Sequence, residues 1–227
     1  MMLSMPDLCN LYAMEVSPQE PLYFGIAETE AERELIYRFR QVNYTRRESY
    51  LLVDGQASDP FDEVSCLFYL RAGEHIVATS RITPQRAGWE LDAIGLPPEL
   101  SRRFDRQYIQ YSRVLVGSAH RNQSLHVLLF HHAARWTLEN TEYRYYVSVC
   151  RRPLMRIYTH FGAQLASEHP VTIPGRKSPY YLVQGSIETV RDTSTLMLHR
   201  IQQSMVSAPR LSHTPTDTSH TNLLGTP

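Results

Sequence analysis

Two arginines stand inside segments that otherwise have the composition of buried β-strands. Arg81 lies in HIVATSRIT and Arg113 lies in YIQYSRVLV, where apolar and β-branched residues dominate. A guanidinium buried in such a strand without an anionic partner is costly, because the charge loses its hydration. If these strands face inward, the fold must bring carboxylates to both arginines. Asp59 and Asp62, in the upstream DPFD segment, are the candidates.

The hydrophobic pattern predicts the other elements. A polar, turn-rich stretch over residues 44–60 separates a first strand and helix from a β-hairpin that turns at residues 71–74. The first helix has an apolar stripe made by Ala31, Leu35, Ile36, Phe39 and Val42. Strands are predicted over 22–26, 65–70, 75–84, 108–116, 143–150, 164–169 and 180–187, and helices over 28–42, 121–140 and 153–161. Residues 91–104, which contain a Pro-Pro pair, are predicted to be a loop or a helix.

This order of elements predicts one α/β domain over residues 1–190, with a mixed sheet flanked by helices. Residues 191–227 are predicted to form a short helix and then a tail rich in Ser, Thr and Pro. That tail has few of the apolar residues that a folded segment buries, so it is expected to be disordered.

Composition narrows the partners and the compartment. The 23 basic and 23 acidic residues give no net charge, so no global field favours nucleic acid or anionic lipid. Neither a signal peptide nor a membrane span is expected. The three cysteines are too few and too widely spaced for a disulfide framework or a zinc knuckle, which favours a reducing, cytoplasmic location. His131 and His132 are adjacent and therefore point about 100° apart on a helix, so no metal site is expected.

Four segments in order resemble a known family: FRQVNYTRRESY, DPFD, ATSRITP and QYSRVLV. They are similar to the acyl-homoserine lactone synthases and the related N-acyl amino acid synthases. In that family an arginine is followed by an aromatic, a basic residue and a second aromatic, a spacing that Arg40, Tyr44, Arg47 and Tyr50 reproduce. Both aromatics are Tyr here, whereas the family usually has Phe and Trp.

The later motifs extend the resemblance. Asp59 and Asp62 match the paired aspartates of the family, and Arg81 matches its arginine near the end of the second hairpin strand. The family's Glu-x-Ser-Arg motif is present as QYSR, with Gln110 in place of the glutamate. An amide is not basic. A water relay, another carboxylate or an amine that arrives neutral must therefore replace the missing glutamate.

The resemblance implies the GNAT (acetyltransferase-like) fold, an α/β fold with a mixed, mostly antiparallel sheet and a V-shaped splay between two central strands. It also implies transfer of a fatty acyl group from an acyl carrier protein thioester to an amine. The product would be an acyl-homoserine lactone signal, made from S-adenosylmethionine, or an N-acyl amino acid. The change at Gln110 makes a free amino acid a serious competitor as acceptor.

The site residues follow from the same resemblance. The thioester would lie in the splay, and the charged network would position the acceptor or only hold the loop after the first helix. The expected catalytic residues are Gln110, Ser112, Arg113 and the backbone amides of Val114 and Val116. The expected substrate-binding residues are Arg40, Tyr44, Tyr50, Asp59, Asp62, Arg81 and Tyr146, and the apolar residues considered for the acyl chain are Leu115, Leu128, Leu129, Tyr146 and Val147.

The donor side gives a weaker signal. The segment RNQSLH, at residues 121–126, lacks the glycines with which acetyltransferases hold the coenzyme A pyrophosphate. A carrier-protein phosphopantetheine is therefore favoured, although acyl-CoA remains possible, and no further cofactor is expected. An acidic carrier protein would meet a surface that includes Arg121, Ser124, Arg151, Arg152 and Arg156. The alternatives are a CoA-dependent GNAT acetyltransferase and a catalytically inactive protein of the same fold.

Overall fold

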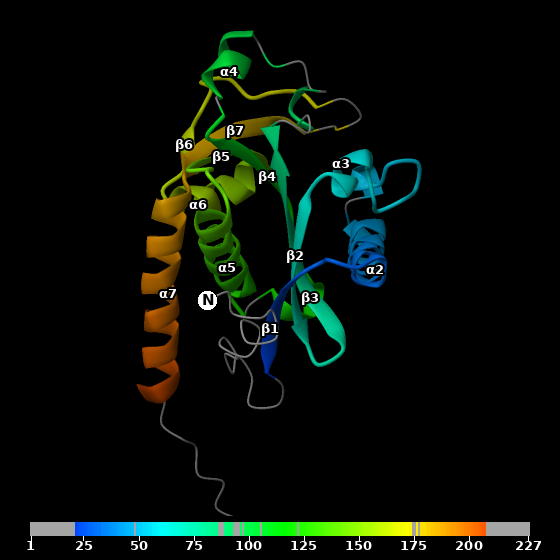
Figure 1. The fold of residues 1–227 in the computed structure, drawn as a ribbon, viewed down its shortest axis with the longest axis vertical. Coiled ribbons are helices and arrows are strands. Elements are labelled where there is room, and N and C mark those ends of the chain that lie inside the picture. The colour runs from blue at the N-terminus through cyan, green and yellow to red at the C-terminus, as the bar shows by residue number, and fades with distance from the viewer. Residues whose placement is uncertain are drawn as a thin grey trace, which may run out of the picture.

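One mixed sheet carries the site, and helices cover both of its faces (Figure 1). The structure is a computed structural model that describes residues 21–47, 49–85, 89–92, 96, 98–104, 106–121, 123–173, 176 and 178–207. Within these ranges the strand order is β1-β2-β3-β4-β5-β7-β6. The strands are β1 (Leu22–Ile26), β2 (Cys66–Ala72), β3 (His75–Pro84), β4 (Tyr108–Val116), β5 (Tyr145–Arg151), β6 (Gln164–Leu165) and β7 (Tyr180–Ser186).

Helix α2 (Glu30–Arg47) covers one face of the sheet and α5 (Leu125–Asn140) covers the other. Helix α7 (Ile187–Ser207) packs along the outer side of α5 (Figure 1). The shorter helices are α3 (Pro60–Glu63), α4 (Pro98–Arg103), α6 (Arg152–His160) and the 3-10 turns η1 (Ser49–Leu51) and η4 (Ser118–His120). None of the helices in the described part of the chain is long and apolar enough to cross a membrane.

The sheet opens between β4 and β5, its parallel pair. Residues 108–110 of β4 pair with residues 145–147 of β5, and beyond them no ladder joins the two strands. β4 also bulges, because its register with β3 shifts between Thr79 and Arg81, and Arg113 has a φ of 55° there. The other strand pairs are antiparallel. The predicted fold, including the V-shaped splay, is confirmed.

Several predicted strands are confirmed at both ends, namely those over 22–26, 75–84 and 108–116. The strand predicted over 164–169 is wrong beyond Leu165. There the hydroxyl of Ser167 accepts a hydrogen bond from the His169 N–H at 3.2 Å and donates one to the His169 carbonyl at 2.9 Å. This local turn competes with the sheet ladder and ends the strand.

Helix α2 is longer than predicted and buries a different row of side chains. Ile36, Arg40 and Tyr44, spaced by four residues, are 0%, 0% and 2% exposed, whereas Leu35 and Val42 of the predicted stripe are 47% and 54% exposed. The loop predicted to start at residue 44 is therefore wrong at its beginning. The apolar pattern misled the prediction because a charged residue occupies the middle of the buried row.

Two later helices also differ from their predicted bounds. The helix predicted over 121–140 begins at Leu125, after Ser124, whose φ of 55° is not helical. The short helix predicted after residue 191 is the long helix α7, so the boundary predicted at residue 190 falls inside it. Ser194, beyond that boundary, is fully buried. The predicted tail after residue 207 lies outside the described residues.

Candidate active site

Side chains from α2, α3 and β3 form a buried charged network. Nη1 of Arg40 lies 2.9 and 3.0 Å from the two carboxylate oxygens of Asp62. Nη1 of Arg81 donates to Asp59 at 2.5 Å and to Asp62 at 3.1 Å. Both guanidinium side chains are fully buried, and the carboxylates are 4% and 1% exposed. The carboxylate partners that the sequence required for Arg81 are therefore the predicted ones.

The two aspartates are held relative to each other by a single helical turn. Asp59 is the N-cap of α3 and accepts a hydrogen bond from the Phe61 N–H at 2.9 Å. Asp62 reciprocates by accepting from the Asp59 N–H at 3.1 Å, which completes a capping box. Pro60 at the first helical position already has the required φ. Asp59 therefore acts both as a helix cap and as an ion-pair partner.

Arg113 extends the network toward the open side of the sheet. Its Nη1 donates to the Leu51 carbonyl at 2.9 Å, and its Nη2 donates to Asp59. The guanidinium carbon also lies 5.9 Å from the centre of the Tyr44 ring, which is within cation–π range. The bulge in β4 thus aims Arg113 at α2 and at the η1 segment. The side chains of Arg47 and Tyr50 in the same region lie outside the described residues.

The arginines control the ionisation of Asp59. Burial alone would raise its pKa, but the charges of Arg81 and Arg113 outweigh burial and hold the pKa below its usual value of 3.8. Asp59 is therefore an anion at neutral pH, and it does not belong to the described lining of the cleft.

Glu90 is a member of this site that the sequence reasoning missed. Its Oε2 accepts from Arg81 Nη2 at 3.0 Å and lies 3.4 Å from Gln110 Nε2, while its Oε1 lies 3.4 Å from Arg176 Nη2. The sequence contains one local indication, because Glu90 stands between the large apolar residues Trp89 and Leu91. In the structure these two are 3% and 1% exposed. An acidic residue between two buried apolar ones is placed by the fold close to the interior.

A cleft of about 440 Å³ occupies the splay between β4 and β5. Its walls include residues 112–116 of β4 and 148–151 of β5. Among the predicted site residues, the described lining contains Tyr44, Ser112, Arg113, Val114, Val116, Arg121 and Arg151. Arg40, Asp59, Asp62 and Arg81 lie in the network behind the cleft, and Gln110 is fully buried beside it.

Backbone amides of β4 face the cleft. The Gly117 N–H donates to the Val77 carbonyl of β3 at 2.9 Å. Because successive N–H groups of a strand alternate in direction, the Val116 N–H points to the opposite side, where β5 has separated. Val114 has the same parity as Val116. These two amides are the predicted oxyanion donors, and the geometry leaves them without a β5 ladder partner.

Cys150 is the one thiol among the described residues that line the cleft. Burial raises its pKa to about 11. At neutral pH it is therefore a thiol, which is a poor nucleophile compared with a thiolate. A covalent acyl-enzyme on Cys150 is disfavoured by this environment.

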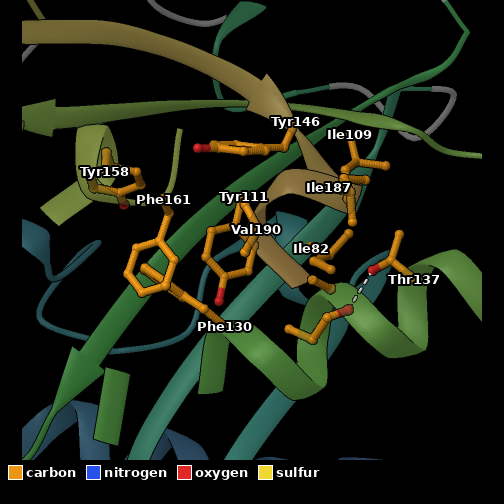
Figure 2. A pocket seen from close by; sticks show the side chains of 12 residues that line it. Ile82, Ile109, Tyr111, Phe130, Thr137, Tyr146, Tyr158, Phe161, Ile187 and Val190 are labelled. Carbon is orange, nitrogen blue, oxygen red and sulfur yellow. Dashed lines mark hydrogen bonds between the residues drawn. The ribbon is translucent and has the colours of Figure 1, made fainter. Parts of the chain in front are cut away.

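An apolar cavity of about 30 Å³ lies next to the cleft (Figure 2). Phe130 and Tyr158 line both spaces and therefore form the wall between them. In Figure 2 the rings of Tyr158, Phe161 and Phe130 gather at one end, and Ile109 and Ile187 lie at the other. Thr137 brings no free polar group, because its hydroxyl donates to the Ala133 carbonyl at 2.7 Å.

The cavity also carries no charge. Burial raises the pKa of Tyr158 to about 12 and raises the pKa of Tyr111 and Tyr146 as well. Tyr146, predicted to bind substrate, lines this cavity and does not belong to the described lining of the cleft. Of the other residues considered for the acyl chain, Leu115 lines the cleft and Val147 belongs to a separate buried cluster around Trp89. Leu128 and Leu129 pack in the main core.

Two of the five residues predicted for the donor side line the cleft. Arg121 and Arg151 line it, and Arg152 and Arg156 are exposed on α6. Ser124 is the N-cap residue of α5 and makes no side-chain capping bond. The described residues contain no group of three or more His, Cys, Asp and Glu side chains that could hold a metal.

Comparison with known proteins identifies the fold. No protein-family model matches the chain, and neither does any curated protein sequence. The N-acyl amino acid synthase FeeM, from uncultured soil microbes, aligns with a TM-score of 0.64 and 16% identity, over 80% of this chain and 99% of FeeM. The CoA-dependent acyl-homoserine lactone synthase BjaI aligns with a TM-score of 0.62 and 17% identity, over 76% of this chain and 83% of BjaI.

An acyl-CoA N-acyltransferase from Pseudomonas aeruginosa also aligns, with a TM-score of 0.54 and 14% identity, over 72% of this chain and 98% of that one. At these identities the likeness shows the fold, which is the GNAT-type acyltransferase fold that the sequence resemblance implied. The roles of the individual residues rest on the geometry described above.

The network makes a prediction for stability and its pH dependence. Asp59→Asn leaves two buried guanidinium groups short of a carboxylate, so we expect the free energy of unfolding at pH 7 to fall by about 3–5 kcal/mol. The folded-state pKa of Asp59 lies below 3.8, so its contribution is present above pH 3.8 and is lost as the pH falls through the folded-state value. The difference in the free energy of unfolding between wild type and variant, measured by urea unfolding, should therefore become smaller below pH 3.8.

Glu139→Gln is the matched control, because Glu139 pairs with Arg135 on the exposed side of α5. That pair should contribute less than about 0.5 kcal/mol. An Asp59→Asn protein as stable as wild type at pH 7 would show that the network does not hold the fold.

Proposed function

We propose that the chain is an N-acyltransferase that moves an acyl group from a thioester to the amine of an amino-acid-derived acceptor. The observation that carries the proposal is the arrangement of the cleft. Its inner end meets charged side chains, its middle exposes backbone amides of β4, and its wall at Phe130 adjoins an apolar cavity. The similarity in fold to FeeM and BjaI also supports the proposed acyl transfer.

The amides of Val114 and Val116 are the proposed oxyanion donors. Attack of an amine on a thioester places negative charge on the carbonyl oxygen, and preorganised N–H groups stabilise that charge. Attack is proposed to be direct, and the neutral state of the Cys150 thiol supports this. The nitrogen forms a bond to the carbonyl carbon, the carbon–sulfur bond breaks, and the sulfur leaves as a thiol after taking a proton from the nitrogen, so that the products are an amide and a free thiol.

The acyl chain is proposed to pass Phe130 and Tyr158 into the apolar cavity. The cavity is uncharged and lined by aromatic and aliphatic side chains, which suits a hydrocarbon chain. Its volume of about 30 Å³ is far below the roughly 300–1,000 Å³ of a typical ligand pocket. An acyl chain of several carbons therefore fits only if the residues of the wall shift.

The donor is proposed to be an acyl carrier protein. Arg121 and Arg151 at the cleft, with Arg152 and Arg156 on α6, form a basic rim that an acidic carrier protein would meet. The α5 entrance has Ser124 where a close approach to pyrophosphate needs a glycine. Acyl-CoA is the second candidate, because BjaI, which has a similar fold, is described as CoA-dependent.

A product assay tests the function. The purified full chain is incubated with acyl carrier proteins or coenzyme A carrying short, medium and long acyl groups, together with S-adenosylmethionine or a mixture of amino acids. Mass spectrometry should detect an acyl-homoserine lactone or an N-acyl amino acid. Absence of an acyl amide with every donor would contradict the proposal.

A matched pair of arginine variants accompanies this assay. Arg113→Lys should lower kcat/KM about 100-fold, because an ammonium cannot contact Leu51, Asp59 and the Tyr44 ring at once and the site shifts. Arg135→Lys, on the exposed side of α5, should retain wild-type activity.

The wall residue Phe130 predicts a change in chain-length preference. Phe130→Ala joins the cleft to the cavity, so we expect kcat/KM for a donor two carbons longer to rise about tenfold relative to the preferred donor of the wild type. The gain corresponds to about 0.8 kcal/mol per buried methylene. Phe104→Ala is the control, because Phe104 is 1% exposed in the cluster around Trp89 and does not line the described part of either space. An unchanged length preference in Phe130→Ala would contradict the proposed path.

A further inference from the structure

Glu90 is a carboxylate of the charged network that lines the cleft, beside Arg113 and Arg176. Its side chain is 21% exposed, compared with 4% for Asp59 and 1% for Asp62. Among the described residues that line the cleft, Glu90 is the one with a carboxylate. An acceptor molecule in the cleft can therefore touch Glu90, whereas the two aspartates lie behind it.

The side chain of Gln110 is complementary to Glu90. Its Oε1 accepts from the Leu91 N–H at 3.4 Å, and its Nε2 donates to Glu90 at 3.4 Å. A glutamate at position 110 could not donate to Glu90, and it would bring two negative charges to this distance. Gln110 and Glu90 therefore form a hydrogen-bonded pair. In this pair the carboxylate belongs to the loop after β3, whereas the family motif has it on the strand.

Among the described residues, charged groups from three segments lie close to Glu90. Arg81 of β3 lies at 3.0 Å, Arg176 of the segment before β7 at 3.4 Å and Arg113 of β4 at 4.0 Å. With Arg40, these arginines outnumber the carboxylates Asp59, Asp62 and Glu90 by one. Glu90 can face an ammonium group, while the neighbouring arginines can face a carboxylate. This pair of opposite charges is complementary to a zwitterion, which has both groups.

We propose that Glu90 binds the ammonium group of an α-amino acid acceptor and takes its proton, in place of the carboxylate that position 110 lacks. Arg176 and Arg113 would attract the acceptor's own carboxylate. This inference rests on the acyl transfer proposed above and identifies the residue that starts it. Both a free amino acid and the amino acid part of S-adenosylmethionine belong to this substrate class.

The proposed step balances as follows. The acceptor ammonium transfers one proton to Glu90 and becomes a neutral amine, whose lone pair forms the bond to the thioester carbonyl carbon. The tetrahedral intermediate collapses, the carbon–sulfur bond breaks, and sulfur leaves with its electron pair. The second nitrogen proton goes to the thiolate, which gives the amide and a free thiol. Glu90 then releases its proton to solvent.

The test uses the full chain with the donor and acceptor that the wild type converts. The variants are Glu90→Gln, the double variant Glu90→Gln with Gln110→Glu, and His126→Gln. His126 is a necessary comparison because it is another ionisable side chain in the cleft, and burial, with His160 nearby, lowers its pKa, so that it is a neutral imidazole. Activity is measured as kcat and KM over a range of pH, and folding by circular dichroism.

Glu90→Gln should lower kcat by about 100-fold or more, as expected for loss of a general base. The ratio of wild-type kcat to Glu90→Gln kcat should fall by up to about tenfold per pH unit as the pH rises, because a larger fraction of the acceptor is then already a neutral amine. The double variant, which returns the carboxylate to β4, should recover much of the lost activity. A residue that only supports the network would show neither the pH-dependent recovery nor the rescue.

Three results would overturn the proposal. The first is a folded Glu90→Gln protein with wild-type activity, and the second is a deficit that stays constant with pH and is not rescued by the double variant. The third is a pH-dependent loss in His126→Gln with none in Glu90→Gln. A wild type that forms no acyl amide overturns acyl transfer itself, which separates that failure from a failure of the Glu90 assignment alone.

Discussion

The fold depends on the burial of Arg81 together with its anionic partners. Its guanidinium donates to Asp59 and Asp62 near α3, to Ser112 on β4 at 3.1 Å and to Glu90 in the loop after β3. A fully buried guanidinium is tolerated when its donors are used, and here one side chain joins four segments. The position of α3 and the entry of Glu90 into the cleft both follow from this requirement.

The splay of the sheet turns this framework into a site. β4 keeps its ladder with β3 on one side and loses β5 on the other after three residue pairs. Amides that a continuous sheet would have paired are therefore presented to the cleft, while the bulge at Arg113 directs its guanidinium to Asp59 and the Leu51 carbonyl. The apolar cavity beyond Phe130 completes the series of charged, polar and apolar surfaces that the proposed acyl transfer needs.

The amino-acid sequence predicts part of this arrangement and misses the rest for physical reasons. Strands β3 and β4 are predictable because apolar and β-branched residues dominate both segments, and the arginines inside them in turn require Asp59 and Asp62. The buried row of α2 is not predictable from apolar periodicity, because Arg40 lies in its middle. Glu90 and Arg176 come from segments without periodic structure, so only the fold brings them together. The barrier between cleft and cavity is likewise hidden, because Phe130 has the pattern of an ordinary core residue.

In the proposed reaction, β4 presents the Val114 and Val116 amides to a bound thioester carbonyl. This arrangement can be tested by NMR with an acyl-pantetheine analogue in which a methylene replaces the sulfur, so that the carbonyl remains and no transfer occurs. The amide resonances of Val114 and Val116 should shift on binding, while Gly117, whose N–H is bonded to Val77 at 2.9 Å, should keep its position. Binding that leaves Val114 and Val116 unchanged, or that shifts Gly117 equally, would contradict this assignment.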